Sequence, residues 1–119
     1  MIRERLRVLV VDDVEDQSEL LRTHLTRAGC DVVTAAGTQE AEEQITRQPP
    51  DVAVIDLLLA GDDNGWLTSA RVRALAPRAA IVITSVLDVS DYPEADATLH
   101  KPFTGAQVKE IVARLKGTL

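Results

Sequence analysis

Three short apolar runs, rich in valine and isoleucine, constrain the fold of this chain most strongly. They cover residues 6–11, 52–55 and 81–83, and none of them alternates with polar residues. Runs of this kind are typical of strands that are covered on both faces, as in a parallel sheet. Two weaker strands are predicted at residues 31–35 and 97–100. The sequence therefore favours a sheet that is buried between two layers.

Helical patterns fill most of the segments between these runs. The pattern predicts helices at about residues 14–28, 38–48, 66–75 and 105–116. The first helix ends before Gly29, where a left-handed helix terminus is expected. Thr38 is predicted to cap the second helix, and Thr104 with Gln107 fits a capping box at the start of the last one. Each helix is thus separated from the next by a predicted strand.

Alternation of strands and helices predicts an α/β fold with a doubly wound parallel sheet. The crossovers between parallel strands are right-handed, so helices cover both faces of the sheet. A length of 119 residues is that of one domain, and we interpret residues 1–119 as a single domain. In sheets of this kind ligands bind at the carboxyl ends of the strands.

Composition excludes several classes of function. The net charge of −6 disfavours direct nucleic-acid binding, because an acidic surface repels phosphates. Cys30 is the only cysteine, so neither a disulfide framework nor a cysteine zinc site is possible within one chain. No apolar run approaches the roughly 20 residues of a membrane helix, and the N-terminus does not resemble a signal peptide. We therefore expect a cytoplasmic protein without a membrane segment.

Polar side chains follow four of the five predicted strands. Asp12 and Asp13 end the first strand, Asp56 the third, Thr84 the fourth and Lys101 the fifth. If these strands are neighbours in a parallel sheet, the side chains meet at one edge. Three adjacent carboxylates repel one another, and a divalent cation with oxygen ligands, such as Mg²⁺, relieves that repulsion.

Each of these residues also has an ordinary structural explanation. Acidic residues such as Asp12 and Asp13 favour the first turn of a helix, and Asp56 fits a common turn position. The Thr84 hydroxyl fits a hydrogen bond to nearby backbone, and Lys101 fits a solvated surface. Because all of them end predicted strands, we favour a shared functional site.

These motifs together resemble the receiver domain of two-component response regulators, the CheY-like superfamily. The resemblance covers about residues 5–117, and it implies a flavodoxin-like five-stranded sheet of order 2-1-3-4-5. The motifs that carry it are Val8-Leu9-Val10-Val11-Asp12-Asp13, Val54-Ile55-Asp56-Leu57, Ile81-Val82-Ile83-Thr84-Ser85 and Lys101-Pro102-Phe103.

The resemblance implies a role for each site residue. Asp56 would be the phosphoacceptor, Thr84 would bind a phosphoryl oxygen in the active state, and Lys101 would pair with the phosphoryl group. The peptide bond between Lys101 and Pro102 would be cis. The Mg²⁺ ligands would be Asp12, Asp13, Asp56 and the backbone carbonyl of Leu58.

The resemblance also implies a place in a phosphorelay. The donor would be a phosphohistidine on a sensor histidine kinase or a histidine phosphotransfer protein, and phosphorylation would change the affinity for an output protein. Such a receiver is a signalling protein that assists only its own phosphotransfer and dephosphorylation, not an enzyme with a separate substrate. The alternative is a pseudo-receiver, an interaction module that works without phosphorylation. A weak homodimer through the last helix and fifth strand is a further expectation.

The chain departs from the family pattern in two loops. The loop after Asp56 is one residue longer than usual, and we expect Asp62 and Asp63 to form a solvated turn rather than extra metal ligands. Only residues 86–96 connect the fourth and fifth strands, and Pro93 interrupts any helix there. The fourth helix of the family must therefore be very short, displaced or absent.

The third departure concerns the residue that usually couples phosphorylation to the output surface. In the family an aromatic residue usually stands three positions before the lysine, whereas this chain has Thr98 there. Tyr92 is an alternative aromatic from the shortened segment, although we favour a partly buried packing role for it. The usual coupling is thus not predicted at Thr98.

Overall fold

Five strands and four α-helices alternate along the computed structural model, which describes residues 5–118. Residues 1–4 and 119, part of the predicted single domain 1–119, lie outside the described residues. The elements in chain order are β1 (Arg7–Val11), α1 (Glu15–Arg27), β2 (Asp31–Ala35), α2 (Thr38–Arg47), β3 (Val52–Asp56), α3 (Gly65–Leu75), β4 (Ala80–Ser85), the 3-10 helix η1 (Val89–Asp91), β5 (Ala97–His100) and α4 (Gly105–Thr118).

All strand pairs are parallel, and the sheet has the order β2-β1-β3-β4-β5. The predicted α/β doubly wound fold is therefore confirmed. β3 lies at the centre of the sheet between β1 and β4, and it is buried along its whole length. This explains why residues 52–55 carry no polar residue, since both faces of β3 are covered.

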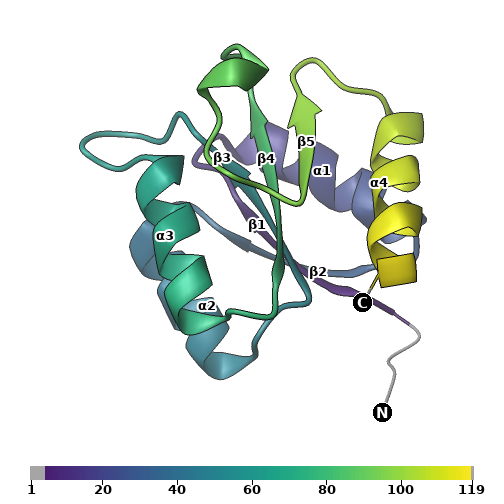
Figure 1. Ribbon diagram of the computed structural model, residues 1–119, viewed down its shortest axis with the longest axis horizontal. Helices are drawn as coiled ribbons and strands as arrows, with labels where there is room; N and C mark the ends of the chain where they lie inside the picture. Colours follow the sequence, from purple (N-terminus) through teal and green to yellow (C-terminus); the bar gives the residue numbers. More distant parts are fainter. Residues whose placement is uncertain (1–4, 119) are drawn as a thin grey trace.

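Helices cover the sheet in two pairs, with α2 and α3 on one face and α1 and α4 on the other (Figure 1). Side chains alternate between the faces along each strand. Val8 and Val10 of β1 pack into the cluster beneath α1 and α4, whereas Leu9 and Val11 pack into the cluster beneath α2 and α3. The two aliphatic cores fix the sheet, and the sheet fixes the positions of the strand ends.

The crossover between β4 and β5 contains η1, a single 3-10 turn of three residues. The expectation of a very short fourth helix is therefore confirmed. Asp88 caps this turn by accepting a hydrogen bond from the Ser90 backbone N–H at 3.0 Å. Leu87, Tyr92 and Ala95 pack from this segment against the core beneath α2 and α3, in place of a full helix.

Most predicted helix ends are confirmed, with one exception. Gly29 adopts a left-handed φ of 92°, and Thr104 and Gln107 form the reciprocal hydrogen bonds of a capping box. The prediction that Thr38 caps α2 is wrong. The capping position is Gly37, and Thr38 is the first helical residue, whose hydroxyl donates a hydrogen bond to Asp63 instead.

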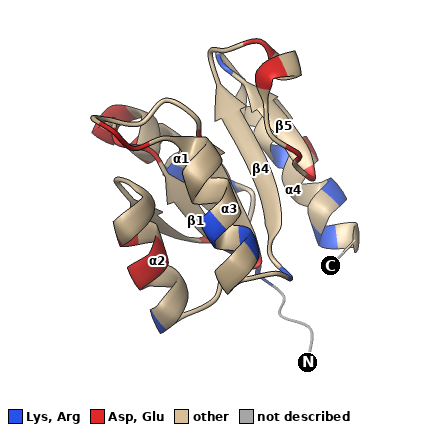
Figure 2. Ribbon diagram, turned by 60° about the vertical axis from the view of Figure 1, so that its left-hand side comes forward, with Lys and Arg blue, Asp and Glu red and all other residues tan. Residues whose placement is uncertain are grey.

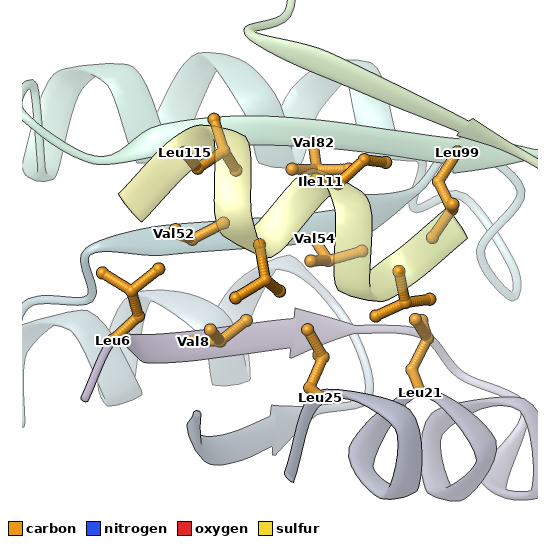
Figure 3. A pocket seen from close by; sticks show the side chains of 12 residues that line it. Leu6, Val8, Leu21, Leu25, Val52, Val54, Val82, Leu99, Ile111 and Leu115 are labelled. Carbon is orange, nitrogen blue, oxygen red and sulfur yellow. The ribbon is translucent and has the colours of Figure 1, made fainter. Parts of the chain in front are cut away.

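A cavity of about 20 Å³ lies inside the core beneath α1 and α4 (Figure 3). Its lining consists entirely of aliphatic side chains from β1, β3, β4, β5, α1 and α4, together with Leu6. A water molecule needs polar partners, which this cavity lacks, so the space is dry. The packing of this core is thus slightly incomplete.

We expect Val54→Ile to stabilise the protein by up to about 0.8 kcal/mol, because the added methylene group enters the cavity that Val54 lines. Urea unfolding at pH 7 measures the change. The matched control is Val11→Ile on the opposite face of the sheet, where the side chain is fully buried and does not line the cavity. Overpacking there should destabilise by about 1–3 kcal/mol. Equal effects of the two substitutions would contradict the cavity assignment.

Candidate functional site

Three of the predicted site residues meet at the carboxyl end of the sheet. The Lys101 ammonium lies 2.8 Å from Asp56 Oδ2 and 3.3 Å from Asp12 Oδ2. Asp12 follows β1, Asp56 ends β3, and Lys101 follows β5. The peptide bond between Lys101 and Pro102 is cis, as expected. The ends of three strands thus bring two carboxylates and one ammonium group into contact.

The register of the sheet explains why a lysine is suited to this position. β5 lies two strands away from β3, which is a distance of about 10 Å at the usual strand spacing. Asp56 is in register with Thr84 of β4, and Thr84 is in register with Leu99 of β5. Lys101 stands two residues after Leu99, and its long side chain spans β4 to reach Asp56.

The three charged groups are largely removed from water. The exposed fractions of the side chains are 13% for Lys101, 0% for Asp12 and 7% for Asp56. Burial raises the pKa of Asp12, although the Val14 N–H and Lys101 oppose the shift. Burial alone would lower the pKa of Lys101, but its hydrogen bond and ion pair with Asp56 outweigh this effect and raise it. The ammonium is therefore held in its charged form beside the carboxylates.

Asp13 and Leu58 border this charged group. One carboxylate oxygen of Asp13, Oδ1, is buried and has no hydrogen-bond partner among the described residues. The Leu58 backbone N–H donates to Asp56 Oδ1 at 3.1 Å, so the backbone of Leu58 lies beside the carboxylate. Within residues 5–118, no three acidic, histidine or cysteine side chains are grouped closely enough to hold a metal by themselves. The described group consists of the carboxylates of Asp12 and Asp56, which share Lys101, and Asp13 follows Asp12 in the chain.

Thr84 is in register with Asp56, but its hydroxyl does not contact the charged group. Its Oγ1 donates a hydrogen bond to the Leu99 carbonyl at 2.7 Å, and the residue is fully buried. In this conformation the side chain therefore follows the structural alternative considered above. Because the hydroxyl has one hydrogen, Thr84 can donate to an oxygen on Asp56 only after this hydrogen bond breaks.

Tyr92 lies near the same end of β4. Its hydroxyl donates to the Ser85 carbonyl at 2.9 Å, and its ring packs partly buried against the core beneath α2 and α3. Burial and the charge of Asp56 raise the pKa of the Tyr92 hydroxyl. Thr98, at the usual aromatic position, is exposed on β5. Tyr92 is thus a packing residue with a hydrogen bond to the strand end, and a switching role for it stays a prediction.

The loop between β3 and α3 is anchored by a residue whose role the sequence did not reveal. Asp63 Oδ2 accepts the Thr38 backbone N–H at 2.8 Å, and Asp63 Oδ1 accepts the Thr38 hydroxyl at 2.6 Å. The expectation of a solvated turn is therefore wrong for Asp63, although Asp62 is exposed. Asp63 supplies the capping acceptor that Gly37 lacks. A glycine before a helix predicts that the first backbone N–H needs an acceptor from elsewhere, but it does not show which residue provides that acceptor.

Several acidic residues lie in the segments at the carboxyl end of the sheet. Figure 2 shows acidic residues at η1 and in the loop before α3, whereas most basic residues lie toward the other end of the sheet. Glu15 and Asp16 add negative charge in the first turn of α1. A surface of this kind attracts cations and positively charged partner surfaces.

Comparison with known proteins agrees with this arrangement. Residues 8–113 match the family described as the response regulator receiver domain. The chain belongs to this family. A putative response regulator from Chloroflexus aurantiacus has the same fold with a TM-score of 0.84, and the two sequences are 31% identical over 96% of this chain and 99% of that one. The chain is therefore a receiver domain, the signal-receiving part of a two-component system.

Two curated relatives are named as transcriptional regulators. The probable transcriptional regulator ycf27 of Porphyridium aerugineum is 31% identical over 98% of this chain and 49% of its own length. The transcriptional regulatory protein GltR of Pseudomonas aeruginosa is 30% identical over 94% of this chain and 48% of its own. The receiver domain thus spans about half the length of these relatives. The expectation of no nucleic-acid partner applies only to the acidic chain described here.

The described helices are too short or too polar to cross a lipid bilayer; this finding covers residues 5–118.

We expect Lys101→Met to lower the free energy of unfolding at pH 7 by about 3 kcal/mol, because it leaves the buried carboxylates of Asp12 and Asp56 without a counter-charge. Urea unfolding measures the loss. Lys109→Met, at an exposed lysine of α4, removes the same charge and should change stability by less than about 0.5 kcal/mol. Similar losses in both variants would show that the ion pairs contribute little.

We expect Asp63→Asn to remove a pH-dependent contribution to stability. Burial alone would raise the pKa of Asp63, but its hydrogen bonds from Thr38 and Asn64 outweigh this and lower it below the ordinary value of 3.8. A lowered folded-state pKa stabilises the fold above the unfolded-state pKa, and this stability disappears as the pH falls through the folded-state value. The difference between wild type and Asp63→Asn, about 1 kcal/mol at pH 7, should therefore shrink below about pH 4.

Urea unfolding of both proteins between pH 2 and pH 7 measures this difference. Asp62→Asn makes the same chemical change at an exposed neighbour and is the control. A difference for Asp63→Asn that does not vary with pH would mean that the carboxylate charge does not stabilise the cap.

Proposed function

We propose that Asp56 is the phosphoacceptor of this receiver domain and that a phosphohistidine on a sensor histidine kinase or phosphotransfer protein is the donor. The observation that carries the proposal is the contact between the Lys101 ammonium and Asp56 Oδ2 at 2.8 Å in a nearly buried site. Asp56 Oδ1 also faces a donor, the Leu58 N–H. The carboxylate is thus held in one orientation, with a positive charge beside it.

The chemistry requires an oriented nucleophile and neutralisation of charge. A carboxylate oxygen of Asp56 attacks phosphorus, the bond from phosphorus to the donor nitrogen breaks, and the donor ring, already protonated on its other nitrogen, leaves as neutral imidazole. Phosphoryl transfer depends more on positioning and electrostatics than on covalent assistance. Lys101 stabilises the negative charge on the transferred oxygens, and the Leu58 N–H fixes the attacking carboxylate.

We propose that Mg²⁺ binds with Asp12, Asp13, Asp56 and the Leu58 carbonyl as its ligands. Because the three carboxylates are not grouped closely enough to hold a metal by themselves, the Leu58 carbonyl and water would complete the ligand set. The unpartnered, buried Oδ1 of Asp13 supports this assignment, because a buried anionic oxygen without a donor is costly unless a cation or water satisfies it. These ligands are all oxygen atoms, which a hard cation prefers. When bound, Mg²⁺ would supply positive charge to the phosphoryl oxygens.

Thr84 and the output surface complete the proposal. Thr84 would bind a phosphoryl oxygen after its hydroxyl leaves the Leu99 carbonyl. We propose that this rearrangement changes the affinity for an output protein in the cytoplasm and that the domain has no other substrate. A weak homodimer through β5 and α4 stays a prediction. The pseudo-receiver alternative lacks support, since the chain contains the complete set of site residues.

Incubation of the protein with Mg²⁺ and acetyl phosphate tests the proposal. We expect a mass increase of one phosphoryl group, stable in acid and lost in base, because an acyl phosphate forms on a carboxylate. Asp56→Asn should abolish the adduct, since an amide is not a nucleophile of this kind. Chelation of Mg²⁺ should also prevent it.

Asp62→Asn is the matched control, because it removes an exposed carboxylate from the same loop. It should be phosphorylated like the wild type. A wild-type protein that gives no adduct under these conditions would support the pseudo-receiver reading, and an adduct that persists in Asp56→Asn would place the phosphoacceptor elsewhere.

A further inference from the structure

We propose that Asp63 is a positioning residue for phosphotransfer, which holds the loop between Asp56 and α3 in the shape that the site requires. The inference rests on the proposed function of Asp56. It concerns residues 57–64, the segment that carries Leu58 beside the carboxylate. The longer loop of this chain thus has an anchor of its own.

The two ends of this loop are fixed by the backbone. At the first end the Leu57 N–H donates to the Thr84 carbonyl at 3.3 Å. At the second end the Gly65 N–H donates to the Leu57 carbonyl at 3.0 Å, and Gly65 lies so close to Asp56 that a Cβ there would collide with the Asp56 carbonyl oxygen. The loop therefore leaves and returns at the phosphoacceptor itself, and a shift of its outer part is transmitted to Asp56 and Leu58.

The outer part of the loop is held chiefly by Asp63. Of the side chains of residues 59–63, all of which the structure describes, only that of Asp63 forms hydrogen bonds, and Leu59 adds an apolar contact with the core. The Asp63 carboxylate accepts from the Thr38 N–H, the Thr38 hydroxyl and the Asn64 N–H at 2.6–2.9 Å. Asp63 thus ties the loop to the first residue of α2.

The hydrogen bonds form a closed circuit. The Thr38 hydroxyl has one hydrogen, which it gives to the carboxylate of Asp63, because a carboxylate can only accept. Thr68 must therefore be the donor in the buried contact of 2.7 Å between the two threonine hydroxyls. The Thr68 hydroxyl then has no hydrogen left for the Asn64 carbonyl, which accepts the Thr68 backbone N–H at 3.2 Å instead. Because the Asn64 N–H in turn donates to Asp63, the circuit joins α2, α3 and the loop.

Gly37 makes room for this anchor. A Cβ at Gly37 would lie 2.6 Å from Asp63 Oδ2, which is too close for any side chain unless the carboxylate moves. The φ of Gly37 is −172°, an extended value that alanine also adopts. Gly37→Ala should therefore displace the Asp63 carboxylate while leaving the backbone and Asp63 itself unchanged. Gly37→Ala thus disturbs the contact between Asp63 and Thr38 from the α2 side, whereas Asp63→Asn disturbs it from the loop side.

The test compares Asp63→Asn and Gly37→Ala with wild type and with the control Asp62→Asn. Mg²⁺ affinity is measured by calorimetric titration and by the emission of Trp66, which stands in the first turn of α3 just after the loop. The rate of phosphorylation by acetyl phosphate is measured on the same proteins, at temperatures well below their melting points. Thermal unfolding reports the structural contribution separately.

We expect both variants to bind Mg²⁺ less tightly and to be phosphorylated more slowly, on the order of tenfold, because misplacement by about 1 Å costs up to about 100-fold in rate. The control should match the wild type. Variants with lowered melting temperatures but wild-type Mg²⁺ affinity and rate would overturn the inference, since Asp63 would then be only a helix cap.

The same experiment separates this inference from the proposed function. A wild-type protein that binds Mg²⁺ without forming an adduct refutes the proposed phosphoacceptor, and the Mg²⁺ affinities of the variants still decide the role of Asp63. If the wild type and all three variants form the adduct at the same rate and bind Mg²⁺ equally tightly, the proposed function is supported and the positioning role is refuted.

Discussion

The Lys101 ammonium is the interaction on which the site depends, because it holds two buried carboxylates together. Asp12 and Asp56 come from adjacent strands, and their side chains are almost entirely withdrawn from water. Without a counter-charge such a pair would be strongly unfavourable. The counter-charge comes from the β5 edge of the sheet, so the site exists only when the four strands β1, β3, β4 and β5 are in register. The same strand pairing therefore determines both the fold and the geometry of the site.

Sequence patterns predicted the sheet and the strand-end residues correctly for one physical reason. A parallel sheet that is covered on both faces must be built from uninterrupted apolar strands, and their carboxyl ends meet at one edge. The apolar run at residues 52–55 therefore predicts both a central strand and the position of Asp56 at its end. The same reasoning does not reveal where a flexible side chain turns. The Thr84 hydroxyl could bond to backbone or to a ligand, and only the structure shows that it donates to Leu99.

A contact between a loop and the start of a distant helix explains the wrong predictions for Thr38 and Asp63. Thr38 fits a capping position in the sequence, but a threonine that starts a helix fits the next position equally well. The acceptor for α2 comes from Asp63, 25 residues further along the chain. A local pattern carries no information about such a partner, because the distance between them is set by the packing of α2 against α3. Asp63 therefore resembled a solvated turn residue until the two helices were placed.

The hydrogen bond between Thr84 and Leu99 bears on how this receiver domain could switch. If Asp56 is phosphorylated as proposed, the Thr84 hydroxyl gains a charged acceptor, and a hydrogen bond of this kind contributes about 1.5–3 kcal/mol. To reach it the hydroxyl must leave the Leu99 carbonyl, and a buried acceptor without a donor costs about 1–3 kcal/mol.

The two ranges overlap, so on these values the phosphorylation proposed above would not by itself fix Thr84 in one position. Phosphorylation would then shift populations rather than lock one state. The segment between β4 and β5 is the part of the chain that a movement of Thr84 would affect most directly. It begins just after β4, the Tyr92 hydroxyl holds it to the Ser85 carbonyl, and its helical part is the three-residue turn η1. Small changes in this segment should consequently alter the balance between the two positions of Thr84.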